Sequence, residues 1–496
     1  MAQHGHPHGF GERYDLPVPM SWVIACACLV IAFTFLISAM GSASPMLNRL
    51  FSSAYTKSFD MEPDKRTSLT YRLMATCSSF LLLLCFTTAT WGSQDALMNF
   101  SPTFIWIIWW IGCSISVVLF GNFWPFIDPW RNLYEFIGFL GNRLHLPHVV
   151  QHTSANQRSK FFYPSFLGLW LGVIGLLTWC GLEIIYPIAS MPRQVSLYIA
   201  AYSLWNWLGM WTFGIEEWCL KADAFSIYFR YLASWRDFFH LSNNQSQVFL
   251  ASQDTHQGAH KNNFNLSQIG FVIAMIASVL FDGLHASSAW LWFESALNRW
   301  GVLSHDVNGY STGILGLLLI WLLFLTIYLL ICQFTLWISF LFPKKQSDAV
   351  TVKAPNSLNF LSTGHVFLKS LLPIAFAYLI AHNFSSLFIQ GQNIIELISD
   401  PFGRMWNLFG TASFYPDITL IDAKVTWYVA TFSIVIGHIV SVLMGHQAAV
   451  SLSELTGRKI RPHCIWVLNL PMTLMMMAFT ALSLSIIAEP LTFIAG

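Results

Sequence analysis

Charged side chains are scarce in this chain. Asp, Glu, Lys and Arg make up 10% of its 496 residues, whereas a soluble domain carries about 25%. The 25 basic and 24 acidic side chains leave a net charge of +1. So few charges exclude a soluble enzyme and a disordered chain, and the near balance excludes a basic nucleic-acid binder.

A cysteine framework is also missing. The nine cysteines lie in or beside apolar runs, and no two of them form a CxxC pair. We therefore interpret them as small buried hydrophobic residues rather than as disulfide partners or a metal-binding motif.

Apolar residues dominate instead, at 55%, with a mean hydropathy of +0.55 and 16% aromatic residues. A bilayer core of about 30 Å needs roughly 20 apolar helical residues, and ten stretches qualify. These are 20–41, 71–91, 103–121, 162–188, 195–220, 266–290, 312–342, 360–391, 424–447 and 465–488. We predict an all-α membrane helix bundle that forms one transmembrane domain over 1–496. No basic region precedes 20–41, so we expect that span to be retained rather than cleaved as a signal peptide.

The basic residues predict the orientation. The loops after the first, third, fifth, seventh and ninth spans hold 19 Lys and Arg in or at their edges, while the N-terminus and the other loops hold four. By the positive-inside rule the first set faces the cytoplasm. Both termini should therefore lie outside it, including the histidine-containing segment 1–19, which is either a metal-binding tract or a disordered end.

The longest connections, 122–161 and 221–265, are cytoplasmic in this topology and mix aromatic rings with single charges. We predict that both lie in the membrane interface as helices. Asp128 followed by Pro129 is typical of a helix start, with Asp as the cap. Asp128 and Asp223 are 95 residues apart, and the two segments are either remnants of a duplication or unrelated.

Ionisable residues inside the spans are the candidates for chemistry, because they are costly in lipid. Asp282 and His285 share one helix face at i, i+3, and His382 and His438 lie in the eighth and ninth spans. We predict that these four side chains converge and bind a divalent metal ion, zinc or another first-row ion, that activates water. The alternative is that each histidine is a hydrogen-bond partner between helices.

Other polar residues extend this prediction. Glu183 and Asp400 are the candidate catalytic carboxylates, and His446, Gln390 and Lys369 are further polar positions in or near the spans. Met472 and Met475–Met477 are expected to serve packing alone.

Several segments together resemble one known family. They are 8–19 (HGFGERYDLPVP), 120–124 (FGNFW) with 128–131 (DPWR), 281–283 (FDG), 381–384 (AHNF), 399–410 (SDPFGRMWNLFG) and the Gly-His pairs 437–438 and 445–446. On these segments the chain resembles the bacterial membrane proteins called fenitrothion hydrolases. The resemblance implies an inner-membrane protein that hydrolyses organophosphorus triesters, which are small apolar substrates, together with a second membrane subunit.

The stretch 399–410 also has a local interpretation. Ser399 or Asp400 is predicted to cap a short helix with Pro401 in its first turn. Trp406 and Phe409 would place that helix on the outer membrane interface, either as a lid or as an anchor.

Three functions remain open at this point. The first is a metal-dependent hydrolase of organophosphorus triesters. The second is a transporter or metal-handling protein, with a polar path that continues to Lys369, Glu216 and His446. The third is a haem protein with His382 and His438 as axial ligands. The bilayer, a small apolar substrate and a second membrane subunit are the expected partners, and nucleic acid is not.

Overall fold

The structure of the chain is a computed structural model. It describes residues 19–41, 68–144, 161–234, 265–300, 309–343, 359–458 and 460–488. Helices dominate these ranges, and none of them contains a β-strand. Eight helical segments are long and apolar enough to cross a membrane, so the prediction of an all-α, multi-pass membrane protein is confirmed. The histidines of segment 1–18 lie outside the described residues.

The eight candidate spans follow the hydropathy pattern closely. They are α1 (Met20–Gly41), α3 (Leu69–Trp91), the run Phe100–Phe120, α14 (Leu266–His285), α16 (Tyr310–Phe340), the run Phe360–Phe388, α20 (Ala423–Leu455) and the run Pro462–Ala488. Three of these runs are composite. The first comprises α4 (Phe100–Pro102), η3 (Thr103–Ile111) and α5 (Gly112–Phe120), the second α17 (Phe360–Leu368), η6 (Lys369–Leu371) and α18 (Leu372–Phe388), and the third η8 (Pro462–Cys464) and α21 (Trp466–Ala488).

The predicted fourth and fifth spans differ from the structure. Helix α9 (Trp170–Ile185) is apolar but short. The stretch 195–220 is interrupted at Gly214, where φ is +88°, so α10 (Pro192–Phe213) ends and α11 (Ile215–Lys221) starts in a new direction. A positive φ is readily adopted by glycine, which has no Cβ to clash.

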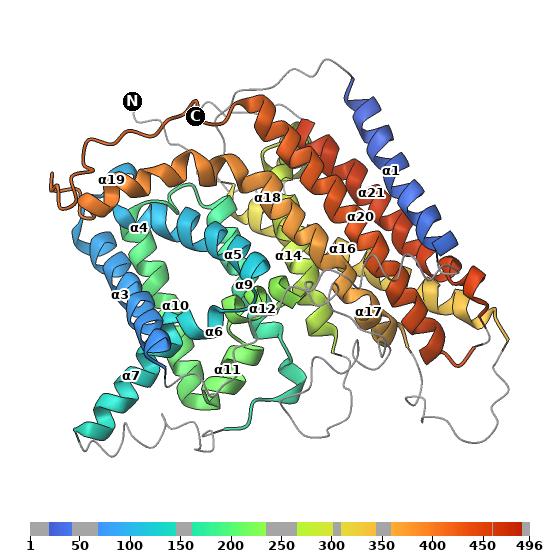
Figure 1. Cartoon of the computed structure of the whole chain (residues 1–496), viewed down its shortest axis with the longest axis horizontal. Coiled ribbons are helices and arrows are strands. Elements are labelled where there is room, and N and C mark those ends of the chain that lie inside the picture. The colour runs from blue at the N-terminus through green and yellow to red at the C-terminus, as the bar shows by residue number, and fades with distance from the viewer. Residues whose placement is uncertain are drawn as a thin grey trace. The chain divides into compact units, whose positions relative to one another are not determined.

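The chain divides into two compact units. Unit 1 comprises 1–11, 58–233 and 382–426, and unit 2 comprises 12–57, 234–381 and 427–496. In unit 2, α1 packs along α21, and α14 packs against α16 and α17 (Figure 1). Helix α14 is buried over most of its length, and Tyr328 on α16 donates a hydrogen bond of 2.6 Å to the carbonyl of Gly364 on α17.

Unit 1 contains the described beginnings of the two segments that were expected in the interface, 122–144 and 221–233. Here α3 packs against α10, and α6 (Trp124–Ile127) and α7 (Pro129–Arg143) follow the third span and also contact α3. Helix α7 exposes apolar side chains such as Phe136 and Phe139, as an interfacial helix would. Helix α12 (Ala224–Ser234) is instead almost wholly buried. Burial on all sides gives α12 a packing role inside unit 1.

Candidate functional site

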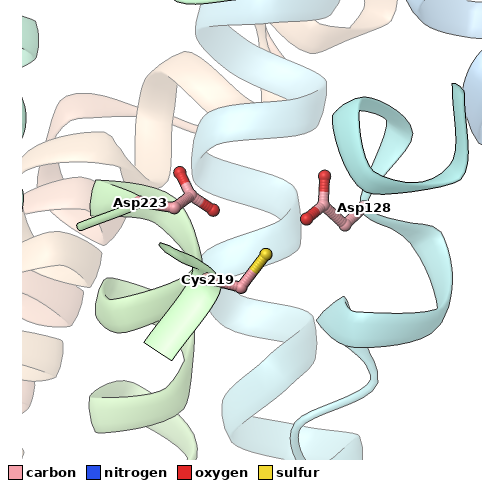
Figure 2. Close-up of side chains that lie close together, drawn as sticks. All are labelled: Asp128, Cys219 and Asp223. Atoms are coloured by element: carbon pink, nitrogen blue, oxygen red, sulfur yellow. The ribbon is translucent and has the colours of Figure 1, made fainter. Parts of the chain in front are cut away.

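Two carboxylates and a thiol meet in the interior of unit 1. The ligand atoms of Asp128, Cys219 and Asp223 all lie within 4.8 Å of one another, and no other group of three such His, Cys, Asp or Glu side chains occurs among the residues that the structure describes. Figure 2 shows the two carboxylates turned toward each other from opposite sides, with the Cys219 sulfur pointing between them. We refer to these three residues as the Asp–Cys–Asp cluster.

Helix starts hold the two carboxylates in place. Asp128 precedes α7, and its Oδ1 accepts hydrogen bonds from the backbone N–H groups of Trp130 at 3.0 Å and Arg131 at 3.2 Å. The predicted capping role of Asp128 is therefore confirmed. Asp223 caps α12 in the same way, since its Oδ2 accepts the Ser226 N–H at 3.1 Å. Both carboxylates thus face positive helix N-termini, which favour negative charge.

A reversal of the chain brings Cys219 and Asp223 to this position. After Gly214 the chain turns back along α10, so that the Trp218 indole N–H donates to Oδ1 of Asn206 at 2.8 Å. A Cβ on Gly209 would lie 2.1 Å from the Trp218 ring, so only glycine lets the ring pack this closely on α10. The Tyr202 hydroxyl, further back on α10, donates a hydrogen bond to Asp223 Oδ1.

The cluster is buried and lacks a direct basic partner. Asp128 and Asp223 are each 1% exposed, and neither forms an ion pair with a basic side chain in the described part of the chain. The nearby Arg131 is paired instead with Glu135 and Glu216. Burial opposes the charge on Arg131, but Cys219, Glu216 and Glu135 together raise its pKa above the ordinary value.

Burial also acts on the carboxylates. It raises the pKa of Asp128, the negative charge of Asp223 raises it further, and the N–H groups and charge of Arg131 only partly offset this. Burial likewise raises the pKa of Asp223 against the hydrogen bonds from Ser226 and Tyr202. Two buried carboxylates at this distance, without a basic ion-pair partner, favour a bound cation or a shared proton.

An aromatic pocket adjoins the cluster. It is a partly open cavity of about 20 Å³, roughly the room that one water molecule needs, and its walls carry no charged side chain. The lining residues are Ile105, Trp106, Trp109, Trp130, Trp179, Val195, Tyr198, Ile199, Tyr202 and Phe225. Tyr202, which bonds to Asp223, lines this pocket. Trp130 and Phe225 line it as well, and each lies two residues after a capping aspartate. The pocket therefore shares these residues with the surroundings of the cluster.

A π-helix contributes three of the surrounding indoles. The segment η3 has i→i−5 hydrogen bonds, as when the Gly112 N–H bonds to the Ile107 carbonyl. Trp109 in this segment contacts the rings of Trp124, Trp130 and Phe225 at centroid distances of 5.9, 6.1 and 4.7 Å. Such π-helical turns are frequent at functional sites because they widen the helix locally.

Three polar atoms of the pocket residues have no hydrogen-bond acceptor or donor in the described ranges. They are the indole nitrogens of Trp106 and Trp179 and the hydroxyl oxygen of Tyr198. Buried polar groups are normally paired. These three side chains therefore keep unused hydrogen-bonding capacity beside the pocket.

The metal ligands predicted from the sequence lie elsewhere. In unit 2, His438 is fully buried; its Nδ1 lies 2.8 Å from the Ile434 carbonyl, and its Nε2 has no partner among the described residues. His285 packs its ring against Phe281 and Trp290, and Asp282 is half-buried on the same helix. The structure does not place these side chains in a group of three ligands, and the set stays a prediction.

The remaining predicted positions are distributed over both units. His446, on α20, and Lys369, in η6, are half-buried in unit 2. In unit 1, His382 lies on α18, and Gln390 begins η7 (Gln390–Gln392). Glu183 is half-buried near the end of α9. None of them belongs to the Asp–Cys–Asp cluster.

The prediction of a helix after Ser399 is wrong. Asp400 follows the last residue of α19 (Asn393–Ser399), and no helix forms over 401–422. Ser399 Oγ instead accepts the N–H groups of Phe409 and Thr411, and Asp400 Oδ1 accepts that of Arg404. These side chains organise a loop, because a hydroxyl or carboxylate binds turn N–H groups as readily as those of a helix start.

Sequence reasoning missed the cluster as a site. Asp128 was noted as a cap, Asp128 and Asp223 as counterparts in a possible duplication, and Cys219 only as a buried hydrophobic residue. The available signal was the similar arrangement of a tryptophan four or five residues before each aspartate, Trp124 before Asp128 and Trp218 before Asp223. Comparison with protein-family models, curated proteins and solved structures gives no significant match.

Proposed function

We propose that the chain is a multi-pass protein of the bacterial inner membrane that hydrolyses organophosphorus triesters in unit 1, with a second membrane subunit as partner. The resemblance to fenitrothion hydrolases suggests this activity. The structural observation that supports it is the uncharged aromatic pocket beside two buried carboxylates. The pocket must widen to admit a nitrophenyl ring; its indole walls would then favour that ring, because aromatic pairs add about 0.5–1.5 kcal/mol beyond the burial of apolar area.

The reaction needs few groups from the protein. Water attacks phosphorus, the new P–O bond forms, and the aryl P–O bond breaks with the electron pair leaving on nitrophenolate. Without a bound ion, a carboxylate at the pocket, Asp128 or Asp223, would take the proton of the attacking water. Nitrophenolate leaves without protonation, so no strong general acid is required. A divalent ion, when bound, would supply Lewis-acid stabilisation of the phosphoryl oxygen.

Ester cleavage in lipid vesicles tests this function. The purified protein should release nitrophenolate from diethyl 4-nitrophenyl phosphate. Val195→Leu, which puts an extra methylene into the pocket, should lower kcat/KM by about tenfold, equivalent to about 1.4 kcal/mol. Val173→Leu is the matched control, since both valines are 1% exposed in unit 1 but Val173 lies outside the pocket. Release no faster than in protein-free vesicles would end the proposal.

The predicted histidine ligands are tested in the same assay. The double variant His382→Ala, His438→Ala should abolish hydrolysis if these imidazoles hold the metal ion. Full activity in that variant would remove the histidines from the mechanism while leaving the pocket in place.

We further propose ten spans with both termini outside the cytoplasm. Helices α9 and α10 would be the ninth and tenth membrane spans, in addition to the eight candidate spans. The distribution of Lys and Arg, 19 on one side and four on the other, supports this orientation. An alkaline phosphatase fused to the C-terminus is then active, because that enzyme must form its disulfides outside the cytoplasm. An inactive fusion would reverse the orientation.

Transport is the second candidate. Two buried carboxylates without a basic partner, beside a helix that is broken at Gly214 and turns back, are also typical of membrane transporters. Uptake of the intact triester into vesicles, driven by a pH gradient and without nitrophenolate release, would favour this function over hydrolysis.

A further inference from the structure

We propose that Asp128, Cys219 and Asp223 form a binding site for one divalent transition-metal ion, with zinc as the preferred ion (Figure 2). Thiolate and carboxylate are both common zinc ligands, and three protein ligands with one open position are typical of catalytic zinc. On a tetrahedral ion such ligand atoms lie roughly 3.5 Å apart, given bond lengths of about 2.0–2.3 Å. The 4.8 Å limit that encloses the three ligand atoms is close enough for small side-chain rotations to reach this geometry.

The thiol is the independent indication of a ligand. Cys219 is 8% exposed, and its sulfur has no hydrogen-bond partner in the described ranges of the chain. A cysteine that serves packing alone faces apolar neighbours. Cys219 instead points between two carboxylates (Figure 2), which is the position of a third ligand to an ion that both carboxylates hold.

The surroundings balance the charge of such a site. Two carboxylates and a thiolate carry three negative charges, and a divalent ion leaves one. The N-termini of α7 and α12 donate N–H groups to Asp128 and Asp223, and helix N-termini stabilise negative charge. Arg131, which is 4% exposed, donates its backbone N–H to Asp128 and adds a positive charge beside the site. The buried anionic site is therefore compensated on several sides.

The free oxygen of Asp128 fits the same role. Its Oδ1 accepts both capping hydrogen bonds, whereas Oδ2 accepts none from the described residues. One carboxylate can thus cap α7 through one oxygen and bind an ion through the other. The competing arrangement is a proton shared between Asp128 and Asp223, in which the thiol has no part.

Cobalt binding tests the proposal. The full-length protein is purified in detergent, stripped with a chelator and titrated with Co²⁺, which gives a near-ultraviolet charge-transfer band only when a thiolate binds it. We expect one Co²⁺ per chain with this band, and loss of the band on addition of Zn²⁺. Cys219→Ser and Cys219→Ala should lose the band, while Cys113→Ser should keep it; Cys113 is the matched control, because it is also 8% exposed in unit 1.

The carboxylates are tested by Asp128→Asn and Asp223→Asn. Asparagine caps helices about as well as aspartate, so these variants keep the local fold and lose the charged ligand. Affinity should fall by at least the 10–100-fold typical of changes to the outer shell of a metal site.

Two results would overturn the proposal. A charge-transfer band that persists in Cys219→Ser places the ion on another cysteine, and the absence of a thiolate band in the wild-type protein leaves the shared proton as the explanation. The titration uses no ester, so its outcome is separate from that of the hydrolysis assay. A protein that binds cobalt through Cys219 but releases no nitrophenolate keeps the metal site and loses the proposed hydrolase function.

Discussion

The hydroxyl of Tyr202 donates a hydrogen bond to Oδ1 of Asp223, 21 residues later in the chain. Tyr202 lies near the middle of α10 (Pro192–Phe213), roughly 15 Å from either end at about 1.5 Å per residue. Asp223 must therefore return to the middle of that helix. This single contact fixes the depth at which the Asp–Cys–Asp cluster lies in unit 1.

Removing this hydroxyl should destabilise the protein. Tyr202→Phe leaves the ring in the pocket but takes a donor from a buried carboxylate, and hydrogen bonds to charged groups contribute about 1.5–3 kcal/mol. The thermal unfolding midpoint in detergent should fall. Tyr198→Phe, one turn earlier on α10, is the control, because the Tyr198 hydroxyl has no partner among the described residues. Equal midpoints for the two variants would contradict the role of Tyr202.

The packing of Trp218 on Gly209 predicts a steric effect. A Cβ at position 209 would meet the indole ring at 2.1–2.3 Å, so Gly209→Ala must displace Trp218 and break its bond to Asn206. We expect a loss of about 1–3 kcal/mol and a lower yield of monodisperse protein in gel filtration. Gly112→Ala should be tolerated, since its nearest neighbour would be 3.9 Å away. A normal yield from Gly209→Ala would show that α11 can move away from α10.

Two substitutions at Asp128 separate its cap from its charge. In the presence of a chelator, Asp128→Asn should be at least as stable as the wild type, because it keeps a capping oxygen and removes the repulsion with Asp223. Asp128→Ala should lose about 1 kcal/mol, the typical value of an N-cap. Unfolding midpoints of the three proteins provide the measurement. An asparagine variant as unstable as the alanine variant would mean that the cap is not what holds α7.

Arg131 should contribute more to the free energy of unfolding than Lys221 does. It is 4% exposed and bonds to Glu135 at 3.0 Å and to Glu216. Arg131→Met removes the buried cation that bonds to these two carboxylates. Because the carboxylates are 32% and 59% exposed, the expected loss is about 1.5–3 kcal/mol, as for hydrogen bonds to charged groups, rather than the larger cost of breaking a fully buried pair. Lys221→Met is the control, because its pair with Glu217 is about one-third exposed and such pairs contribute about 0–1 kcal/mol. Comparable unfolding midpoints for the two variants would refute this ranking.

Some of the fold could be predicted because its causes are local. The first span was expected at 20–41, and α1 occupies Met20–Gly41, since an unbroken apolar run of that length dictates its own helix. The start of α7 at Asp128–Pro129 was also predicted from a local cause, because an aspartate cap followed by proline is typical of a helix start. The helix expected after Ser399 did not form, because its capping residues bind the N–H groups of a loop, and hydropathy carries no information about that choice.

The sequence by itself determined that this is an all-helical membrane protein, because scarce charge and long apolar runs are properties of each segment alone. Only the tertiary structure decided that Asp128, Cys219 and Asp223 meet beside an aromatic pocket. Their contact depends on the turn at Gly214 and on the close approach that Gly209 permits to Trp218. Such contacts join side chains about 90 residues apart in sequence, and no periodicity or local motif encodes the distance between them.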